Sequence, residues 1–226
     1  MRDLLLKKLF RGVDPFKTWR NHSGKKADHS YPHSGLSPDL VRQTIKRILD
    51  RNITVPLIVE VGSFKGGSAC TIASTIKEAG LHATLLCIDT FLGDVNMRTD
   101  HNGWLDWLDL QGGHPTVFDQ FMANIVDRGH QDVVLPLVAS STVGLRALQR
   151  IGITFPMAYL DSAHEAEETM LELKLLSRLM PGGSVLLGDD FSWPSVSGDV
   201  VTFVQQRKLN MNILDGHYYS IDMKGE

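Results

Sequence analysis

The chain has 226 residues, of which 42% are hydrophobic and 22% are charged, and its formal net charge is −3. These values are ordinary for a globular protein and exclude disordered, fibrous and small disulfide-stapled classes. No apolar run reaches the roughly 20 residues needed to cross a bilayer, and the negative balance argues against a nucleic-acid-binding protein. We therefore expect a well-buried core with neither a membrane nor a nucleic-acid partner.

The charge is unevenly distributed along the chain. Residues 1–36 contain eight Lys/Arg and three Asp/Glu, which gives +5, so the rest of the chain carries −8. We expect a basic N-terminal arm over residues 1–36, followed by a single domain over residues 37–226. The arm is either an exposed segment or a segment that meets an anionic ligand or an acidic partner subunit, as in a homo-oligomer.

The first ten residues, MRDLLLKKLF, lack the apolar core of a secretion signal and favour a short amphipathic helix packed on the body. Cys70 and Cys87 both lie in apolar periodic segments, which favours buried free thiols rather than a disulfide or a metal pair. Together these features predict a cytoplasmic protein.

From Ser37 onward the pattern is that of alternating helices and strands. Ser37-Pro38-Asp39 opens a predicted helix that runs to about Arg51. Apolar runs then predict strands at 57–61, 84–88, 133–138, 157–160 and 184–187, and helical periodicity predicts helices at 68–79, 117–128, 142–151, 165–180 and 196–208.

The chain ends in a predicted hairpin, with strands at 212–214 and 218–221 on either side of Asp215-Gly216. Strands separated by helices imply right-handed crossovers. We therefore expect an α/β fold: a doubly wound, mostly parallel, seven-stranded Rossmann-like sheet with a C-terminal antiparallel hairpin strand. In such folds ligands bind beyond the carboxyl ends of the strands.

A glycine-rich turn, EVGSFKGGS, follows the first predicted strand over residues 60–68. Phe64 occupies the second glycine position of a dinucleotide fingerprint, and the turn lacks the lysine of a P-loop. This spacing suits a nucleoside that carries a small carboxylate at the helix N-terminus. Asp89, 27 residues after Gly62, ends the second strand and is placed to bind a ribose diol. The alternatives are a tight turn and a loop cap without a ligand.

A second group of polar residues follows the fourth and fifth parallel strands: Asp161 and His164, then Asp189 and Asp190. Carboxylates that converge at one rim repel one another, and a hard divalent cation such as Mg²⁺ or Mn²⁺ relieves that repulsion. The ordinary pKa of histidine suits His164 as a general base. Loop capping or a solvated surface is the non-metal alternative.

The segment at about 90–115 is too long for a simple connection and is interpreted as a lid or a substrate insert. Phe91, Trp104, Leu105 and Trp107 supply apolar surface for an acceptor. The alternative is a short surface helix whose tryptophans pack on the domain.

Taken together, these motifs resemble class I S-adenosylmethionine-dependent methyltransferases. The closest similarity is to the metal-dependent small-molecule O-methyltransferases of the macrocin type and, more distantly, to the catechol type. The resemblance covers residues 57–221 and depends mainly on the D-x-x-H segment at Asp161–His164 and the G-D-D segment at Gly188–Asp190. The D-T-F-x-G-D segment at Asp89–Asp94 adds to it.

The resemblance implies transfer of a methyl group to a hydroxyl of a small molecule, such as a sugar or a diol-bearing natural product. It implies that His164 is the catalytic base and that Mg²⁺ or Mn²⁺ binds Asp161, Asp189 and Asp190. It implies that S-adenosylmethionine binds Glu60, Gly62, Ser63, Gly66, Ser68, Asp89, Ser141 and Asp161. The motifs leave open a non-catalytic member that binds S-adenosylmethionine or a sugar, a related antibiotic-pathway hydroxylase, and the identity of the acceptor.

Overall fold

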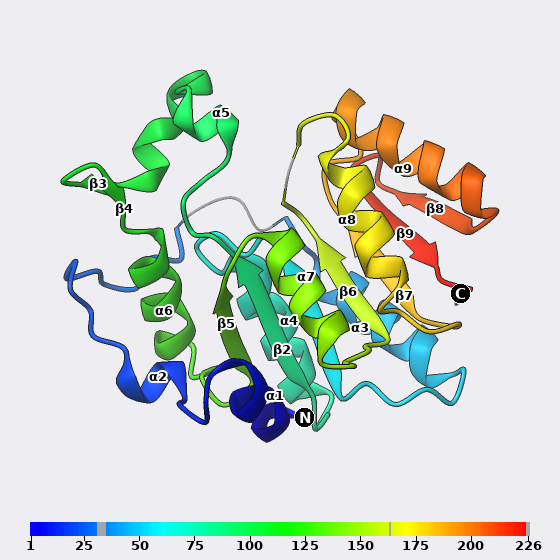
Figure 1. The fold of residues 1–226 in the computed structure, drawn as a ribbon, viewed down its shortest axis with the longest axis horizontal. Coiled ribbons are helices and arrows are strands. Elements are labelled where there is room, and N and C mark those ends of the chain that lie inside the picture. The colour runs from blue at the N-terminus through cyan, green and yellow to red at the C-terminus, as the bar shows by residue number, and fades with distance from the viewer. Residues whose placement is uncertain (31–34, 163, 225–226) are drawn as a thin grey trace.

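The structure is a computed structural model and describes residues 1–30, 35–162 and 164–224. In these ranges the main sheet has seven strands in the order β5-β2-β1-β6-β7-β9-β8 (Figure 1). The predicted fold class is confirmed. The strands are β1 (Leu57–Val61), β2 (Thr84–Asp89), β5 (Val134–Val138), β6 (Met157–Leu160), β7 (Val185–Gly188), β8 (Asn210–Leu214) and β9 (Tyr218–Asp222).

The first five of these strands are parallel, and β9 runs antiparallel to both β7 and β8. Strand β1 is buried along its whole length, Glu60 included, as expected for a mostly apolar strand in a sheet that is covered on both faces. Pro136 lies in the edge strand β5, where its missing N–H leaves no gap in the ladder.

Helices cover both faces of the sheet (Figure 1). One apolar cluster joins the sheet to α1 (Arg2–Leu9), α7 (Ser141–Arg150), α8 (Glu168–Ser177) and α9 (Pro194–Arg207). The opposite cluster joins it to α3 (Pro38–Leu49), α4 (Gly67–Glu78) and α6 (Val117–Asp127). Helix α3 begins as predicted, because the Ser37 side chain accepts a hydrogen bond from Asp39 N and Pro38 occupies the first turn. In the described ranges no helix combines the length and apolar character that a membrane span requires.

The helix predicted from residue 165 begins instead at Glu168. Glu167 has a left-handed φ of 72°, and residues 165–167 form a turn. The predicted start was wrong because the charged residues before Glu168 carry no apolar face to hold them in the helix. The carbonyl of His164 accepts a hydrogen bond from Ser195 Oγ, which ties this turn to α9.

The N-terminal arm packs on its own chain. Leu5 is completely buried, and Arg2 donates to the carbonyls of Gln131 and Val134 at 2.8 and 2.7 Å. After the short helix α2 (Pro15–Thr18), Trp19 Nε1 donates to Asp119 at 2.8 Å. Part of the basic arm therefore meets polar and acidic groups of the same molecule.

The insert contains α5 (Val95–Arg98), a 3₁₀ segment η1 (His101–Leu108) and the short pair β3 (Leu110–Gln111) and β4 (His114–Pro115). Trp104 stacks on Trp107, with ring centroids 5.0 Å apart, and approaches Trp193 at 6.2 Å. The interpretation of Phe91 as acceptor surface was wrong. Phe91 is only 2% exposed and packs edge-on against Phe118 at 5.0 Å, so it belongs to the core.

Truncation of the arm's apolar contact tests whether the arm is part of the fold. Leu5→Ala removes a fully buried side chain and should lower the free energy of unfolding by about 2–5 kcal/mol. Leu4→Ala, at a neighbouring side chain that is 42% exposed, is the matched control and should change it by about 0.5 kcal/mol or less. Urea unfolding measures both, and equal effects would contradict the packing of α1.

Candidate active site

The ends of four strands, β1, β2, β6 and β7, meet at one rim of the sheet. Asp161 N donates to Val61 O at 2.9 Å, Gly62 N donates to Ile88 O at 3.0 Å, and Asp189 N donates to Leu160 O at 3.0 Å. Gly62 has a φ of 83°, and a Cβ there would lie 1.8 Å from the carbonyl oxygen of Asp161. Only glycine fits this position, so the glycine turn lies directly against the strand end that carries Asp161.

Asp89 tethers the glycine turn to the end of β2. Its Oδ2 accepts hydrogen bonds from Ser63 N and Phe64 N, both at 2.8 Å, and its Oδ1 accepts one from Phe91 N at 2.6 Å. The backbone of Thr90 also hydrogen-bonds this carboxylate, so four main-chain donors hold it in place. The predicted ribose contact stays a prediction, and the structure adds a backbone role to this side chain.

Glu60 is fully buried beneath the same turn. Ser63 Oγ donates to its Oε2 at 2.5 Å, and the Ser68 hydroxyl and the Cys87 thiol also hydrogen-bond this carboxyl. Burial raises the pKa of this carboxyl, against the opposing effect of the Ser63 and Ser68 hydroxyls. This carboxyl therefore links the glycine turn to the start of α4 and to β2.

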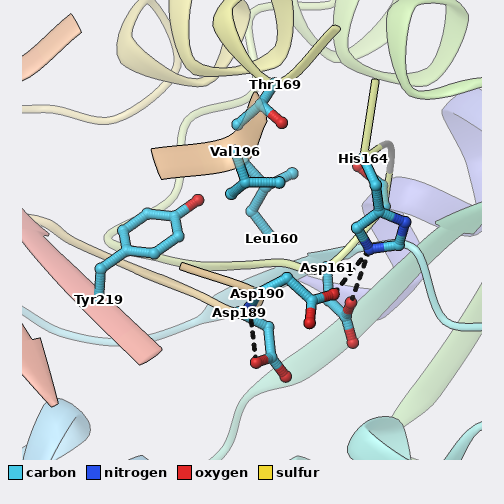
Figure 2. A pocket seen from close by; sticks show the side chains of 9 residues that line it. Leu160, Asp161, His164, Thr169, Asp189, Asp190, Val196 and Tyr219 are labelled. Carbon is cyan, nitrogen blue, oxygen red and sulfur yellow. Dashed lines mark hydrogen bonds and ion pairs between the residues drawn. The ribbon is translucent and has the colours of Figure 1, made fainter. Parts of the chain in front are cut away.

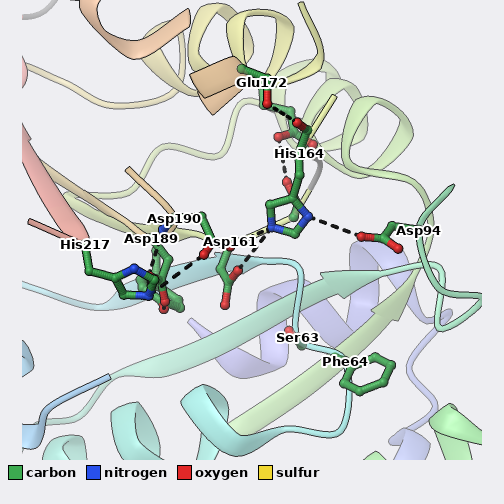
Figure 3. A network of polar contacts seen from close by, with 12 residues as sticks. Ser63, Phe64, Asp94, Asp161, His164, Glu172, Asp189, Asp190 and His217 are labelled. Carbon is green, nitrogen blue, oxygen red and sulfur yellow. Dashed lines mark hydrogen bonds and ion pairs between the residues drawn. The ribbon is translucent and has the colours of Figure 1, made fainter. Parts of the chain in front are cut away.

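His164 lies between carboxylates on both sides of its ring (Figure 3). Its Nδ1 is 3.2 Å from Asp94 Oδ2, and its Nε2 is 2.7 Å from Asp190 Oδ2 and 4.0 Å from Asp161 Oδ1. Burial lowers the pKa of the imidazole, but the contacts with Asp190 and Asp94 outweigh it and raise the pKa to about 10. The imidazole ring also lies 5.0 Å from the Trp193 ring.

Asp189 is buried and has partners on both carboxylate oxygens. Tyr159 OH donates to Oδ2 at 2.7 Å, and Oδ1 accepts from Asp190 N at 2.7 Å and lies 2.8 Å from His217 Nε2. Asp190 has a left-handed φ of 57°, a conformation that costs free energy outside glycine and that gathers at functional sites.

The predicted metal ligands fall into two groups that share Asp190. Possible ligand atoms of Asp161, His164 and Asp190 lie within 4.8 Å of one another, and so do those of Asp189, Asp190 and His217. The three predicted carboxylate ligands do not form one such group by themselves, and Asp190 is the residue that the two groups share.

These residues fit a divalent cation. Burial, followed by the charges of Asp189 and Asp190, raises the pKa of Asp161 well above its usual range, which is the repulsion that a cation relieves. A cavity of about 10 Å³, the space of one water molecule, adjoins this cluster; Asp161, His164, Asp189 and Asp190 line it together with Leu160, Val196 and Tyr219 (Figure 2).

The other predicted cofactor residues have structural partners. Gly66, with a φ of 84°, lies against the Phe121 ring, and Ser68 is buried at the start of α4. Ser141 is the first residue of α7, and its hydroxyl is directed to the buried carboxylate of Glu172, which also accepts from Ser162 Oγ at 2.6 Å.

Sequence reasoning missed three residues of this site: Asp94, Tyr159 and His217. Asp94 lies in a segment noted only for its resemblance, and it caps α5 as well as contacting His164. His217 follows the predicted Asp215-Gly216 turn, and no spacing with another histidine marks it as a ligand. The signal was available, since a hairpin whose second strand pairs antiparallel with the fifth strand brings its turn to the carboxyl-end rim.

A family model described as a methyltransferase domain matches residues 59–191, which is more than half of the chain. The chain belongs to this methyltransferase family. The family resemblance predicted from the motifs is thereby confirmed. No curated protein gave a significant match to the methyltransferase.

Solved structures share the methyltransferase's fold at low identity. The O-methyltransferase NovP is 16% identical with a TM-score of 0.63, covering 98% of this chain and 97% of its own. CalS11, a calicheamicin methyltransferase, is 18% identical with a TM-score of 0.60, covering 84% and 80%. An O-methyltransferase from Bacillus cereus in complex with SAH is 13% identical with a TM-score of 0.56, covering 97% and 91%.

Because the carboxyl of Glu60 is buried, we predict that the stability of the protein depends on pH. Its pKa is raised above 4.5 in the folded methyltransferase, so the folded state holds a proton that the unfolded chain releases. The stability that this bound proton gives the folded state is therefore complete below pH 4.5, and it is lost as the pH rises toward the pKa of Glu60 in the folded protein. Glu60→Gln does not titrate, so its stability relative to the wild type should increase between about pH 4 and about pH 7.

Urea unfolding across this pH range measures the difference between the two proteins. Glu78→Gln makes the same chemical change on an exposed side chain of α4 and is the matched control, with a smaller expected effect. A Glu60→Gln advantage that does not change with pH would contradict the burial of a titrating carboxyl at this position.

Proposed function

We propose that the protein transfers a methyl group from S-adenosylmethionine to a hydroxyl of a small molecule, with a divalent metal ion at the acidic rim. The observation that carries this proposal is the gathering of His164, Asp161 and Asp190 directly beside the Gly62 turn. The proposal draws support from relatives that are described as O-methyltransferases, among them NovP.

The glycine turn and its buried carboxylates would hold the cofactor, which supplies a sulfonium methyl group. The carboxylate of Asp89, at the end of β2, would bind the ribose diol, and Glu60 would support the glycine turn from below. The other residues proposed to line this site are Gly62, Ser63, Gly66, Ser68, Ser141 and Asp161.

Asp161, Asp189 and Asp190 would hold the metal, Mg²⁺ or Mn²⁺. When bound, a divalent ion lowers the pKa of an acceptor hydroxyl and fixes its position. The positive charge of a cation in the cluster would lower the pKa of His164 from its value of about 10 without a metal. The neutral imidazole would then accept the hydroxyl proton on Nε2 while the acceptor oxygen takes the methyl group from the sulfonium. Asp94 orients the imidazole through Nδ1, which leaves Nε2 directed at the cluster.

The acceptor would enter beside the aromatic rings that adjoin His164. Trp193 contacts the His164 ring, and Trp104 of the insert approaches Trp193. The rings of Trp193 and Trp104 offer an apolar surface next to the charged cluster, and this combination suits a sugar or a diol-bearing natural product. The relative CalS11 is described as a TDP-rhamnose 3′-O-methyltransferase, which favours a sugar hydroxyl as the first acceptor to test.

Replacement of the proposed base tests the proton transfer. His164→Ala should lower the rate of methyl transfer by about 10²–10⁴-fold, the usual range for loss of a general base. Its affinity for S-adenosylmethionine should stay within about threefold of the wild type, because His164 faces the acidic cluster. Labelled S-adenosylmethionine measures the rate and isothermal titration measures the affinity. His82→Ala, at an exposed histidine outside the site, is the control, and near-normal turnover of His164→Ala would refute the assignment.

Metal removal tests the second part of the proposal. Treatment with a chelator should abolish transfer to a panel of diol acceptors, and addition of Mg²⁺ or Mn²⁺ should restore it. Mass spectrometry should show a product that is heavier than the acceptor by one CH₂. A product heavier by one oxygen would identify a hydroxylase instead. Full turnover in metal-free protein would contradict metal dependence, while no binding of S-adenosylmethionine would remove the proposal as a whole.

A further inference from the structure

His217 belongs to the turn between β8 and β9, at the edge of the acidic cluster (Figure 3). Its backbone carbonyl accepts a hydrogen bond from Phe191 N at 2.8 Å, which fixes the turn against the segment after β7. Its side chain is 45% exposed, with Nε2 2.8 Å from Asp189 Oδ1 and 3.8 Å from Asp190 Oδ1. The ring therefore presents a nitrogen to two carboxylates from the open side of the site.

Asp190 divides its two oxygens between two histidines. Oδ2 lies against His164 Nε2, and Oδ1 faces His217 Nε2. Ligand atoms of Asp189, Asp190 and His217 lie within 4.8 Å of one another, so one cation can contact all three. Tyr159 donates to the remaining oxygen of Asp189 and holds that carboxylate in place, as hydrogen bonds to metal ligands commonly do.

The ligand chemistry of this group differs from that of a purely acidic site. Carboxylates and water suit Mg²⁺, whereas an imidazole nitrogen favours Co²⁺, Ni²⁺ or Zn²⁺. An ion that enters between Asp189 and Asp190 meets the His217 nitrogen at once. That nitrogen must either coordinate the ion or be displaced from the carboxylates.

We propose that His217 is a further protein ligand of the metal site and that it shifts the site's preference from Mg²⁺ toward divalent ions that accept imidazole. This inference rests on the metal site of the proposed function. It assigns the C-terminal hairpin a part in metal selection in addition to its place in the sheet.

The two possible fates of the imidazole have opposite consequences for His217→Asn. If His217 coordinates Co²⁺, the variant loses a ligand and binds Co²⁺ about tenfold or more weakly. Mg²⁺ prefers oxygen and water, so the variant removes only a competitor for Asp189 and should bind Mg²⁺ equally well or more tightly. The ratio of the two affinities therefore reports coordination, and simple loss of an ion pair does not reproduce it.

The experiment is isothermal titration of the full-length, metal-free protein with Co²⁺ and, separately, with Mg²⁺ at one fixed pH. The wild type is compared with His217→Asn and with His82→Asn, an exposed histidine outside the site. The visible absorption spectrum of bound Co²⁺ gives a second readout of its ligands. His217→Asn should keep the fold, because the hydrogen bond to Phe191 comes from the backbone, and thermal unfolding checks this.

We expect His217→Asn to lose Co²⁺ affinity and change the Co²⁺ spectrum, with Mg²⁺ affinity held or increased and His82→Asn unchanged. The inference is overturned if both metals bind His217→Asn as they bind the wild type, or if both bind it more tightly. Titration of the same preparations with S-adenosylmethionine separates this inference from the proposed function. If His217→Asn binds Co²⁺ like the wild type and both proteins still bind S-adenosylmethionine, only the role of His217 is contradicted.

Discussion

Mutual repulsion among three carboxylates at one rim is the constraint on which this site depends. Asp161, Asp189 and Asp190 follow adjacent parallel strands, and burial together with neighbouring charge raises the pKa of Asp161 well above its usual range. His164 and His217 flank the cluster and direct a nitrogen to each oxygen of Asp190. Strongly perturbed groups in such an arrangement are typical of sites that bind or transform a ligand. Membership of a methyltransferase family indicates that a ligand bound near this rim takes part in methyl transfer.

The backbone makes this crowding unavoidable, because glycine allows the strand ends to approach. Gly62 leaves no room for a Cβ beside the carbonyl of Asp161. A Cβ on Gly188 would lie 2.0 Å from the ring of Tyr219, which packs across the end of β7 and lines the small cavity. The glycine turn and the segment that carries Asp161 are therefore in direct main-chain contact. This rigidity holds reacting groups at fixed positions, which is a large part of what an active site contributes.

The sequence predicts this architecture well where burial is continuous and less well where tertiary contacts decide. Strand β1 was located residue for residue, because a short and mostly apolar run that ends at a glycine turn is typical of a strand in a parallel sheet covered on both faces. Asp161 and Asp189 were placed at one rim by topology alone. The contacts of Asp94 and His217 depend on how an insert and a hairpin fold back over the sheet, and no local pattern encodes that. The late start of α8 was also not predictable from a local pattern. It follows from the left-handed conformation of Glu167, in the turn after His164.

The central claim is that one divalent ion binds the carboxylates after β6 and β7, beside the glycine turn. Anomalous diffraction from crystals grown with Mn²⁺ and S-adenosylhomocysteine measures this directly. We predict a manganese peak about 2.0–2.3 Å from carboxylate oxygens of Asp161, Asp189 or Asp190, with the thioether sulfur on the Gly62 side of that ion. A peak remote from these residues, or a nucleoside bound away from the turn, would contradict the account.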